Sequence, residues 1–193
     1  PTKRDGWFNT ITSGELTRVM CEFYRVLARD AHAWIMSDGQ TLGYILGYSE
    51  VAGFDYCKPY PVIKMTKDGS SIKQGMGYHG RASHEYVTLL EKGRRRFNDE
   101  NWPDVFQVPW TGAAETRPFT EDGKPYPTAK PLSLMQRLIE LSTNEGDLVC
   151  DPFLGSGTTA VACVSLGRRF VGGDCNPASV AVTDRRIADR KGL

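Results

Sequence analysis

The sequence of 193 residues lacks the features that mark membrane-spanning and secreted proteins. It has no apolar run long enough to cross a bilayer, and its first residues, PTKRDGW, include neither the apolar core of a signal peptide nor an initiator Met. Its five cysteines lie far apart without a C-x-x-C pair, which argues against a zinc site and favours buried free thiols. We therefore expect one intracellular domain with no metal and no membrane partner.

The sequence also lacks a strong net charge, because 24 Lys and Arg residues stand against 23 Asp and Glu residues. The charges are nevertheless unevenly distributed. From Lys58 to Arg96 there are nine basic and three acidic residues, whereas Asp99 to Lys130 holds six acids and three bases. The basic stretch indicates either a surface for a polyanion such as nucleic acid or an ordinary solvated face.

Hydrophobic periodicity predicts helices that alternate with short strands. The predicted helices follow the Thr12–Glu15 capping box, cover 41–50 and 131–141, end at 166, and begin again near 178. The predicted strands cover 33–36, 61–65, 86–90, 148–150 and 170–172. The span 98–128 contains five prolines and no sustained period, so we expect it to be irregular. This alternation predicts an α/β fold with a doubly wound, mostly parallel sheet.

One glycine-rich stretch, DPFLGSGTTA from Asp151 to Ala160, joins a predicted strand to a predicted helix. Gly155 and Gly157 allow its backbone to approach a ligand, and the helix start offers N–H donors. Asp174 follows the next strand, where dinucleotide-binding folds place an acid for ribose hydroxyls. The pattern is neither G-x-G-x-x-G nor a triphosphate loop, so we expect a nucleoside without pyrophosphate, with a purely structural turn as the alternative.

The run from Lys130 to Pro177 closely resembles the amino-group DNA methyltransferases that make N6-methyladenine or N4-methylcytosine, in the permuted class whose cofactor half follows its catalytic half. Upstream segments, FYRVLARDAHAWIMSDGQTLGYI, VAGFDYCKPYPVIKM and HEYVTLLEKGRRRF, are similar to the same family. The resemblance implies a Rossmann-like methyltransferase fold. It divides a single domain into 1–97 (the rest of the catalytic half), 98–129 (a target-recognition insertion) and 130–193 (the cofactor half).

The resemblance also implies S-adenosylmethionine as the cofactor. Asp174 is expected at its ribose, the glycine turn at its methionine portion, and Lys130 on its amino-acid side, while Thr158 and Thr159 cap the helix. The full set of implied cofactor residues is Lys130, Pro131, Asp151, Pro152, Phe153, Gly155, Ser156, Gly157, Thr158, Thr159, Asp174, Cys175 and Asn176.

The sequence departs from the family pattern at three of these elements. Family members usually have Glu where Asp174 stands, which is a chemically conservative difference. They also have His where Tyr126 stands and Tyr near Ser179. These last two departures put the contacts around them in doubt.

The family's catalytic signature, an Asp, Ser or Asn followed by two prolines and an aromatic residue, is absent from the 193 residues. In that motif a side-chain oxygen and a backbone carbonyl accept the protons of the target amine while the aromatic ring stacks on the flipped base. Asp151-Pro152-Phe153 belongs instead to the glycine turn. We expect the tetrapeptide upstream of residue 1; the alternative is a degenerate or split protein that binds cofactor without catalysis.

Basic residues in two places are candidates for contact with double-stranded DNA. They are Lys64, Lys67, Lys73 and Arg81, which flank a Gly-rich loop, and Arg94, Arg95 and Arg96, which follow a predicted strand. An ordinary solvated turn is the alternative for this group. Permuted-class relatives suggest a homodimer as well.

Several other polar and aromatic side chains have two interpretations. His84 and Glu85 favour a structural role, because methyl transfer does not require a histidine. Asp38 either caps a helix or touches a ligand, and the aromatic rings of Tyr60, Tyr126 and Trp110 either stack on a base or pack a loop.

The sequence thus predicts a site-specific DNA methyltransferase of a restriction-modification type, with adenine N6 favoured over cytosine N4 as the target. We expect it in the cytoplasm, encoded by a prokaryote or a phage. A catalytically silent cofactor- or DNA-binding subunit of a larger assembly is the alternative.

Overall fold

The computed structural model describes residues 11–77, 79–110, 118, 123, 126 and 129–191. Contacts divide the chain into two compact units. Unit 1 comprises Pro1–Pro61 and Glu85–Arg95, and unit 2 comprises Val62–His84 and Arg96–Leu193. Within the ranges described, no helix is both long and apolar enough to cross a membrane.

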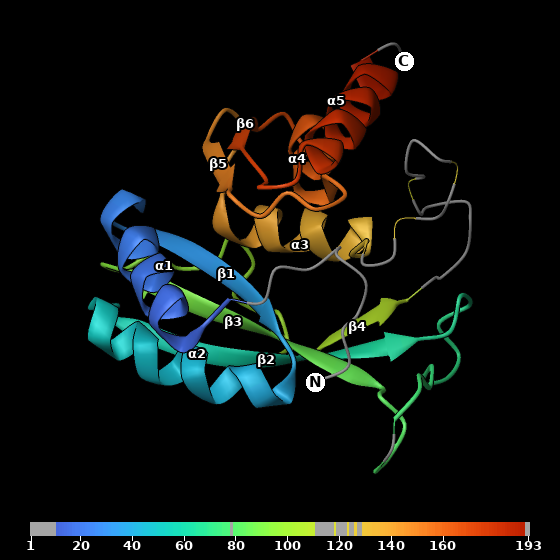
Figure 1. Ribbon diagram of the computed structural model, residues 1–193, viewed down its shortest axis with the longest axis horizontal. Helices are drawn as coiled ribbons and strands as arrows, with labels where there is room; N and C mark the ends of the chain where they lie inside the picture. The colour runs from blue at the N-terminus through green and yellow to red at the C-terminus, as the bar shows by residue number, and fades with distance from the viewer. Residues whose placement is uncertain are drawn as a thin grey trace. The chain divides into compact units, whose positions relative to one another are not determined.

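Two helices of unit 1 pack against each other (Figure 1). Helix α1 (Ser13–Val26) begins at the predicted capping box, in which Thr12 and Glu15 each accept a hydrogen bond from the other's backbone N–H. Helix α2 (Gly39–Ala52) begins after Asp38, whose Oδ1 accepts the N–H of Thr41 at 2.7 Å. Asp38 is therefore a helix cap, one of the two roles that the sequence left open.

The core of unit 1 lies where these helices meet two antiparallel strands. Strand β1 (Ala31–Ser37) pairs with β3 (His84–Lys92), with Ala33 opposite Leu90. Leu90 is fully buried together with Met20 from α1 and Ile45 from α2. Apolar side chains from both helices and the strand thus share one core, as the helical spacing in the sequence predicted.

Strand β2 (Tyr56–Met65) is longer than the predicted strand 61–65. It joins β4 (Phe106–Pro109) in a four-stranded sheet of order β1-β3-β2-β4. Only Val62–Met65 pairs with β4, in parallel. Pro59 and Pro61, which cannot donate a ladder hydrogen bond, precede that paired stretch, and this explains why β2 tolerates them.

The prediction that 98–128 is irregular was wrong for β4. Phe106 and Val108 are 2% and 6% exposed, and they alternate with exposed neighbours as in a half-buried strand. The strand has only four residues and ends in a proline, so its period was too short to detect in the sequence. Most of residues 111–128 lie outside the described part of the chain.

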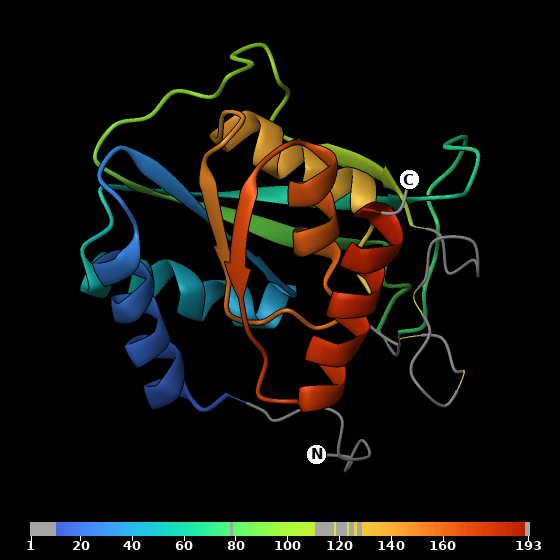
Figure 2. The same cartoon turned by 90° about the horizontal axis from the view of Figure 1, so that it is seen from above.

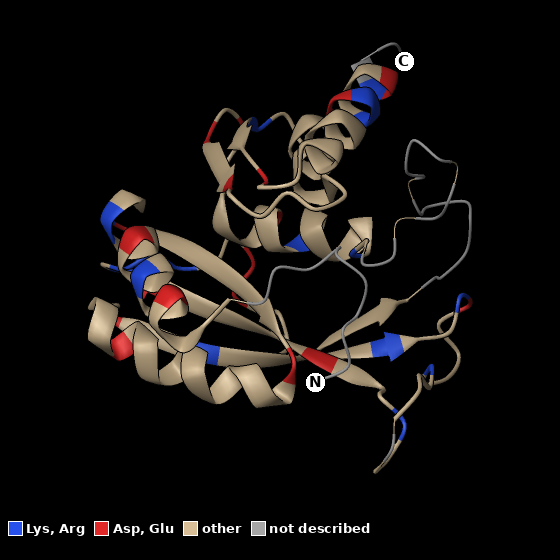
Figure 3. Ribbon diagram, viewed as in Figure 1, with Lys and Arg blue, Asp and Glu red and all other residues tan. Residues whose placement is uncertain are grey.

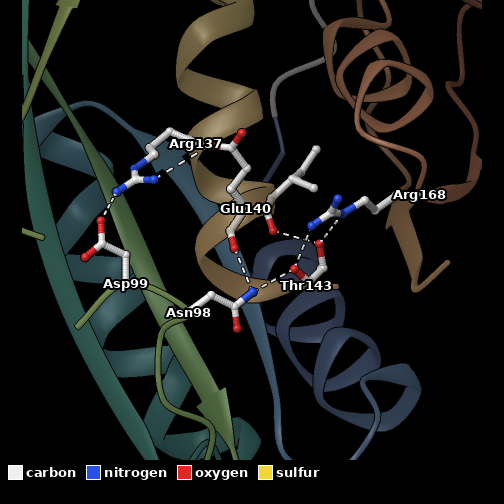
Figure 4. Close-up of polar contacts among 7 residues, drawn as sticks. Asn98, Asp99, Arg137, Glu140, Thr143 and Arg168 are labelled. Carbon is white, nitrogen blue, oxygen red and sulfur yellow. Dashed lines mark hydrogen bonds and ion pairs between the residues drawn. The ribbon is translucent and has the colours of Figure 1, made fainter. Parts of the chain in front are cut away.

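Within unit 2, the residues before β4 are hydrogen-bonded to the end of helix α3 (Leu132–Ser142), as Figure 4 shows. The Asn98 side-chain amide donates to the carbonyls of Glu140 and Thr143, each at 2.8 Å. Arg168 donates to the same Thr143 carbonyl at 2.8 Å, and Arg137 pairs with Asp99. The last carbonyls of α3, which have no partner within the helix, are satisfied in this way.

The remaining elements of unit 2 form the predicted βαβ arrangement (Figure 2). Strands β5 (Leu148–Asp151) and β6 (Arg169–Gly172) are parallel, and α4 (Thr158–Ser165) connects them. Helix α4 packs against α3 through buried Ile139, Ala162 and Cys163, and against α5 (Pro177–Lys191). The predicted alternation of helices and strands is therefore present, although the antiparallel β1–β3 pair makes the larger sheet mixed.

The cysteines are free, as predicted, but most are not buried. Only Cys163 is buried, and burial raises the pKa of its thiol to about 12. Cys21, Cys150 and Cys175 are exposed. The sequence left their burial open to the packing of α1, β5 and the loop after β6, which decided which faces meet solvent.

Candidate functional site

The glycine turn, residues 151–157, connects β5 to α4 and is held against the end of β6. The Leu154 N–H donates to the Gly173 carbonyl at 3.0 Å, and the Gly173 N–H donates to the Asp151 carbonyl at 3.1 Å. Within the turn, the Gly157 N–H donates to the Leu154 carbonyl at 2.8 Å. These backbone bonds fix the turn independently of its side chains, so its shape is preformed.

The two glycines of the turn are required for different reasons. Gly155 has φ +50°, and a Cβ there would meet only the Phe153 carbonyl and the Tyr126 hydroxyl, both at 3.9 Å. Gly157 has φ +74°, and a Cβ there would lie 2.3 Å from Oγ1 of Thr183 in α5. The space beside Gly155 therefore allows a ligand to approach, whereas Gly157 permits close packing of α5.

Asp174 fastens the loop after β6 to the glycine turn. One carboxylate oxygen accepts the Gly155 N–H at 2.8 Å and the other accepts the Asn176 N–H at 2.8 Å. An ionised carboxylate has about four acceptor positions, so these two bonds leave others for ribose hydroxyls. Asp151 has a local role, because its Oδ1 accepts the N–H of Phe153 at 2.9 Å.

The hydroxyl side chains after the turn do not act as predicted. The residue that caps α4 is Gly157, without a side-chain hydrogen bond, so Thr158 and Thr159 are not its caps. Thr158 is buried and its hydroxyl lies 3.1 Å from that of Ser156. Thr159 donates to Sδ of Met135 in α3 at 3.8 Å. Both threonines lie inside the first turn of the helix, where their side chains face neighbouring helices.

Arg186 of α5 was not identified from the sequence, although its guanidinium reaches the glycine turn. It donates to the Ser156 carbonyl and lies 3.4 Å from the Thr158 hydroxyl. Burial lowers the pKa of Arg186, and Arg190 lowers it further. No local pattern marks this residue, because its contact depends on how α5 packs against α4.

The remaining predicted cofactor residues lie in three places: before α5, in the glycine turn and at the start of α3. Asn176 precedes α5 and its Oδ1 accepts the Ala178 N–H at 3.1 Å, so it caps that helix. Cys175, Pro152 and Phe153 are exposed. Pro131 caps the start of α3, but the ammonium of Lys130 lies 5.5 Å from the ring centroid of Trp110.

Two of the three departures from the family pattern, Tyr126 and Ser179, contact each other. The hydroxyls of Tyr126 and Ser179 lie 2.9 Å apart, and the two residues are only 7% and 1% exposed. The Tyr126 hydroxyl also borders the space beside Gly155. Two sequence differences that looked independent therefore form one buried hydrogen bond next to the glycine turn.

The predicted DNA-contacting lysines are partly gathered around Trp110. Lys64 lies over its ring, with Nζ 4.7 Å from the centroid, and Nζ of Lys73 donates to its carbonyl at 2.6 Å. Lys67 and Arg81 are exposed on the loop between β2 and β3. Figure 3 shows basic residues along this loop and at the end of β2.

The arginine turn, residues 93–96, is surrounded by acidic side chains. The backbone N–H groups of Gly93 and Arg94 donate to Asp55 and Asp30, at 2.7 and 2.8 Å. The N–H of Arg95 donates to Glu91, and Arg96 pairs with Glu100 at 3.1 Å. This environment favours the solvated-turn interpretation over a phosphate grip for the three arginines.

Two further features concern titratable groups. His84 is exposed, whereas His32 has a side chain only 1% exposed, with Nε2 2.9 Å from the Arg95 carbonyl. Burial lowers the pKa of His32, an effect that the Arg95 carbonyl and Glu91 oppose.

Among the described residues, no group of three His, Cys, Asp or Glu residues is arranged to hold a metal ion.

Comparison with known proteins finds relatives whose sequences are similar to this chain. The chain is 44% identical over 78 residues to the type II methyltransferase M2.DpnII of Streptococcus pneumoniae, which covers 40% of this chain and 29% of that protein. It is 32% identical over 151 residues to the methylase YubD of Escherichia coli K12, covering 78% and 59%. The chain thus spans less than two thirds of either relative's length.

A solved structure shows the same fold. The M1.HpyAVI complex with S-adenosylmethionine superimposes with a TM-score of 0.71 at 22% sequence identity, covering 93% of this chain and 85% of that one. This confirms the predicted Rossmann-like α/β fold. Because the DNA methylase family model of the N6 and N4 type matches residues 11–184, nearly the whole described chain, the protein belongs to the DNA methylase family.

Proposed function

We propose that this chain binds S-adenosylmethionine at the glycine turn and takes part in transferring its methyl group to an exocyclic amine in DNA. The observation that carries the proposal is the contact of Asp174 with the Gly155 N–H at 2.8 Å, beside a position where a Cβ would meet nothing closer than 3.9 Å. A carboxylate with spare acceptor positions next to open backbone suits a ribose with two hydroxyls.

The residues of this chain would hold and orient the cofactor. Asp174 would accept hydrogen bonds from the ribose, and the backbone around Gly155 would contact the methionine portion. When bound, S-adenosylmethionine supplies an electrophilic methyl group on a sulfonium. Orientation of that group toward a flipped base would supply the rate enhancement that comes from proximity.

The cofactor part of the proposal is tested by calorimetry on Asp174→Ala. We expect the affinity for S-adenosylmethionine to fall by about 1–3 kcal/mol, as for loss of a charge-assisted hydrogen bond. Asp147→Ala is the matched control, because Asp147 also accepts a backbone N–H, that of Asn144, at 2.8 Å in a turn of unit 2. Equal affinities for the two variants would remove Asp174 from the cofactor site.

The reaction is tested with the full-length protein, labelled S-adenosylmethionine and mixed-sequence double-stranded DNA. We expect label in N6-methyladenine after digestion of the DNA to nucleosides; label in N4-methylcytosine would correct the base. A cofactor- or DNA-binding subunit without catalysis is a second candidate, because the Pro-Pro-aromatic tetrapeptide is absent from these 193 residues. Cofactor binding without any methyl transfer would favour that second candidate.

A further inference from the structure

Three lysines that are distant in the sequence converge on Trp110. The ammonium groups of Lys64 and Lys130 lie 4.7 and 5.5 Å from the centroid of its ring. Lys73 donates to its backbone carbonyl at 2.6 Å. The ammonium groups of Lys64 and Lys130 are thus no further apart than the sum of those two ring distances.

The backbone around Trp110 holds this cluster in place. The Trp110 N–H donates to the Met65 carbonyl at 2.9 Å, which continues the parallel pairing of β4 with β2. The Lys73 N–H donates to the Lys64 carbonyl at 2.7 Å, so the loop after β2 folds back onto the strand. The backbone of the half-buried Trp110 is therefore held by hydrogen bonds between β4 and β2, and the lysines gather around a side chain whose position is fixed.

Gathering cations in this way favours an anion of more than one charge. An aromatic face attracts each ammonium and offsets part of their mutual repulsion. A group of positive charges on a rigid support raises the local potential and attracts a polyanion. The exposed Lys67 and Arg81 lie on the loop after β2, which also carries Asp68.

We propose that Lys64, Lys73 and Lys130, organised by Trp110, form one site for the phosphate backbone of double-stranded DNA. Lys130 then serves DNA binding, whereas the sequence resemblance implied that it contacts the cofactor. The inference rests on the proposed function and deepens it, because it joins the segment before α3 to the basic loop as one DNA-contacting surface.

The experiment measures the affinity for a labelled DNA duplex as a function of salt, together with the affinity for S-adenosylmethionine. The variants are Lys64→Met, Lys130→Met and Trp110→Leu. Lys58→Met is the matched control, because Lys58 also lies on β2 over an aromatic ring, 4.9 Å from the centroid of Tyr60. The unfolding midpoint of each variant is recorded so that a fold defect in Trp110→Leu is recognised.

We expect each lysine variant to weaken DNA binding several-fold and to reduce the slope of log affinity against log salt by about 0.9. Trp110→Leu removes no charge, yet we expect a weaker affinity and a smaller slope because its lysines lose their support. Cofactor affinity should remain within about twofold of the wild type, since these are phosphate contacts alone. Lys58→Met should match the wild type in every measurement.

Three results would overturn the inference, in distinguishable ways. Loss of cofactor affinity in Lys130→Met with unchanged DNA binding would return Lys130 to the cofactor site. DNA binding by all variants that equals the Lys58→Met control would remove the cluster from the DNA surface while the proposed function stands. Absence of DNA binding by the wild type would overturn both.

Discussion

The glycine turn and the arginine turn have the same construction but different surroundings. Each follows a strand, contains a glycine with positive φ, and donates backbone N–H groups to carboxylates from elsewhere in its unit. At the arginine turn, three acidic side chains accept backbone N–H groups beside the arginines. At the glycine turn, Asp174 leaves open space beside Gly155. Backbone N–H groups bound to carboxylates thus support a candidate binding site in one case and a surface turn with balanced charges in the other.

The largest effect expected from this comparison is that of Gly157→Ala. We expect a loss of about 3 kcal/mol in the free energy of unfolding, because φ is +74° and the new Cβ would lie within 2.8 Å of three Thr183 atoms. Gly155→Ala has open space, so we expect only about 1 kcal/mol from backbone strain. Urea unfolding of both variants measures the difference. Equal losses would mean that α5 can move away from the turn.

The corresponding test of the arginine turn is Gly93→Ala. Its φ is +81° and the new Cβ would lie 2.3 Å from Oδ1 and 2.8 Å from the backbone nitrogen of Asp30. We expect a loss of about 2–3 kcal/mol in unfolding free energy. Gly146→Ala is the control, because Gly146 has φ +82° with nothing within 4 Å. If the control is as destabilised as Gly93→Ala, strain alone accounts for both.

The hydroxyl pair beside the glycine turn provides a smaller effect. We expect Tyr126→Phe and Ser179→Ala each to lower the unfolding free energy by about 1 kcal/mol, because each leaves a buried hydroxyl without its partner. The double variant should lose less than the sum of the two, which a double-mutant cycle measures. Tyr44→Phe, whose ring is 57% exposed, should leave stability unchanged. Full additivity would show that the two hydroxyls do not act as a pair.

The arginine turn also predicts a dependence of stability on pH. Burial holds the pKa of His32 below its usual value of 6.5, so the unfolded chain takes up a proton at that residue first. Stability from His32 is complete above pH 6.5 and falls as the pH drops toward the folded pKa. Unfolding midpoints between pH 7 and 5 should therefore decline more steeply in the wild type than in His32→Gln.

The smallest effect is expected at the surface ion pair of the arginine turn. The Arg96 and Glu100 side chains are 85% and 60% exposed, so we expect Arg96→Met to change the unfolding free energy by no more than about 0.5 kcal/mol. Arg137→Met should cost more, because Arg137 is 26% exposed, pairs with Asp99 and lies 3.9 Å from the Trp102 ring centroid. Thermal unfolding of the two variants measures the contrast, and a larger loss at Arg96 would contradict it.

Several features of the protein were determined by the sequence itself, because they depend on residues close together in the chain. The capping box of α1 needs only Thr12 and Glu15, and both sides of it are present. The β5–α4–β6 arrangement follows from local apolar runs around a glycine turn. The resemblance of the run from Lys130 to Pro177 to one family was also a property of the sequence, and the match over residues 11–184 confirms that family.

Tertiary structure alone decided what each of these local features contacts. Gly157 is needed because Thr183 of α5 packs against it, and the hydroxyl of Tyr126 meets Ser179, 53 residues further along the chain. Lys130 lies over Trp110, a contact that no spacing in the sequence indicates. A local pattern fixes the backbone of an element, but the neighbours of a side chain depend on how distant elements pack, which hydrophobic burial and close packing determine for the fold as a whole.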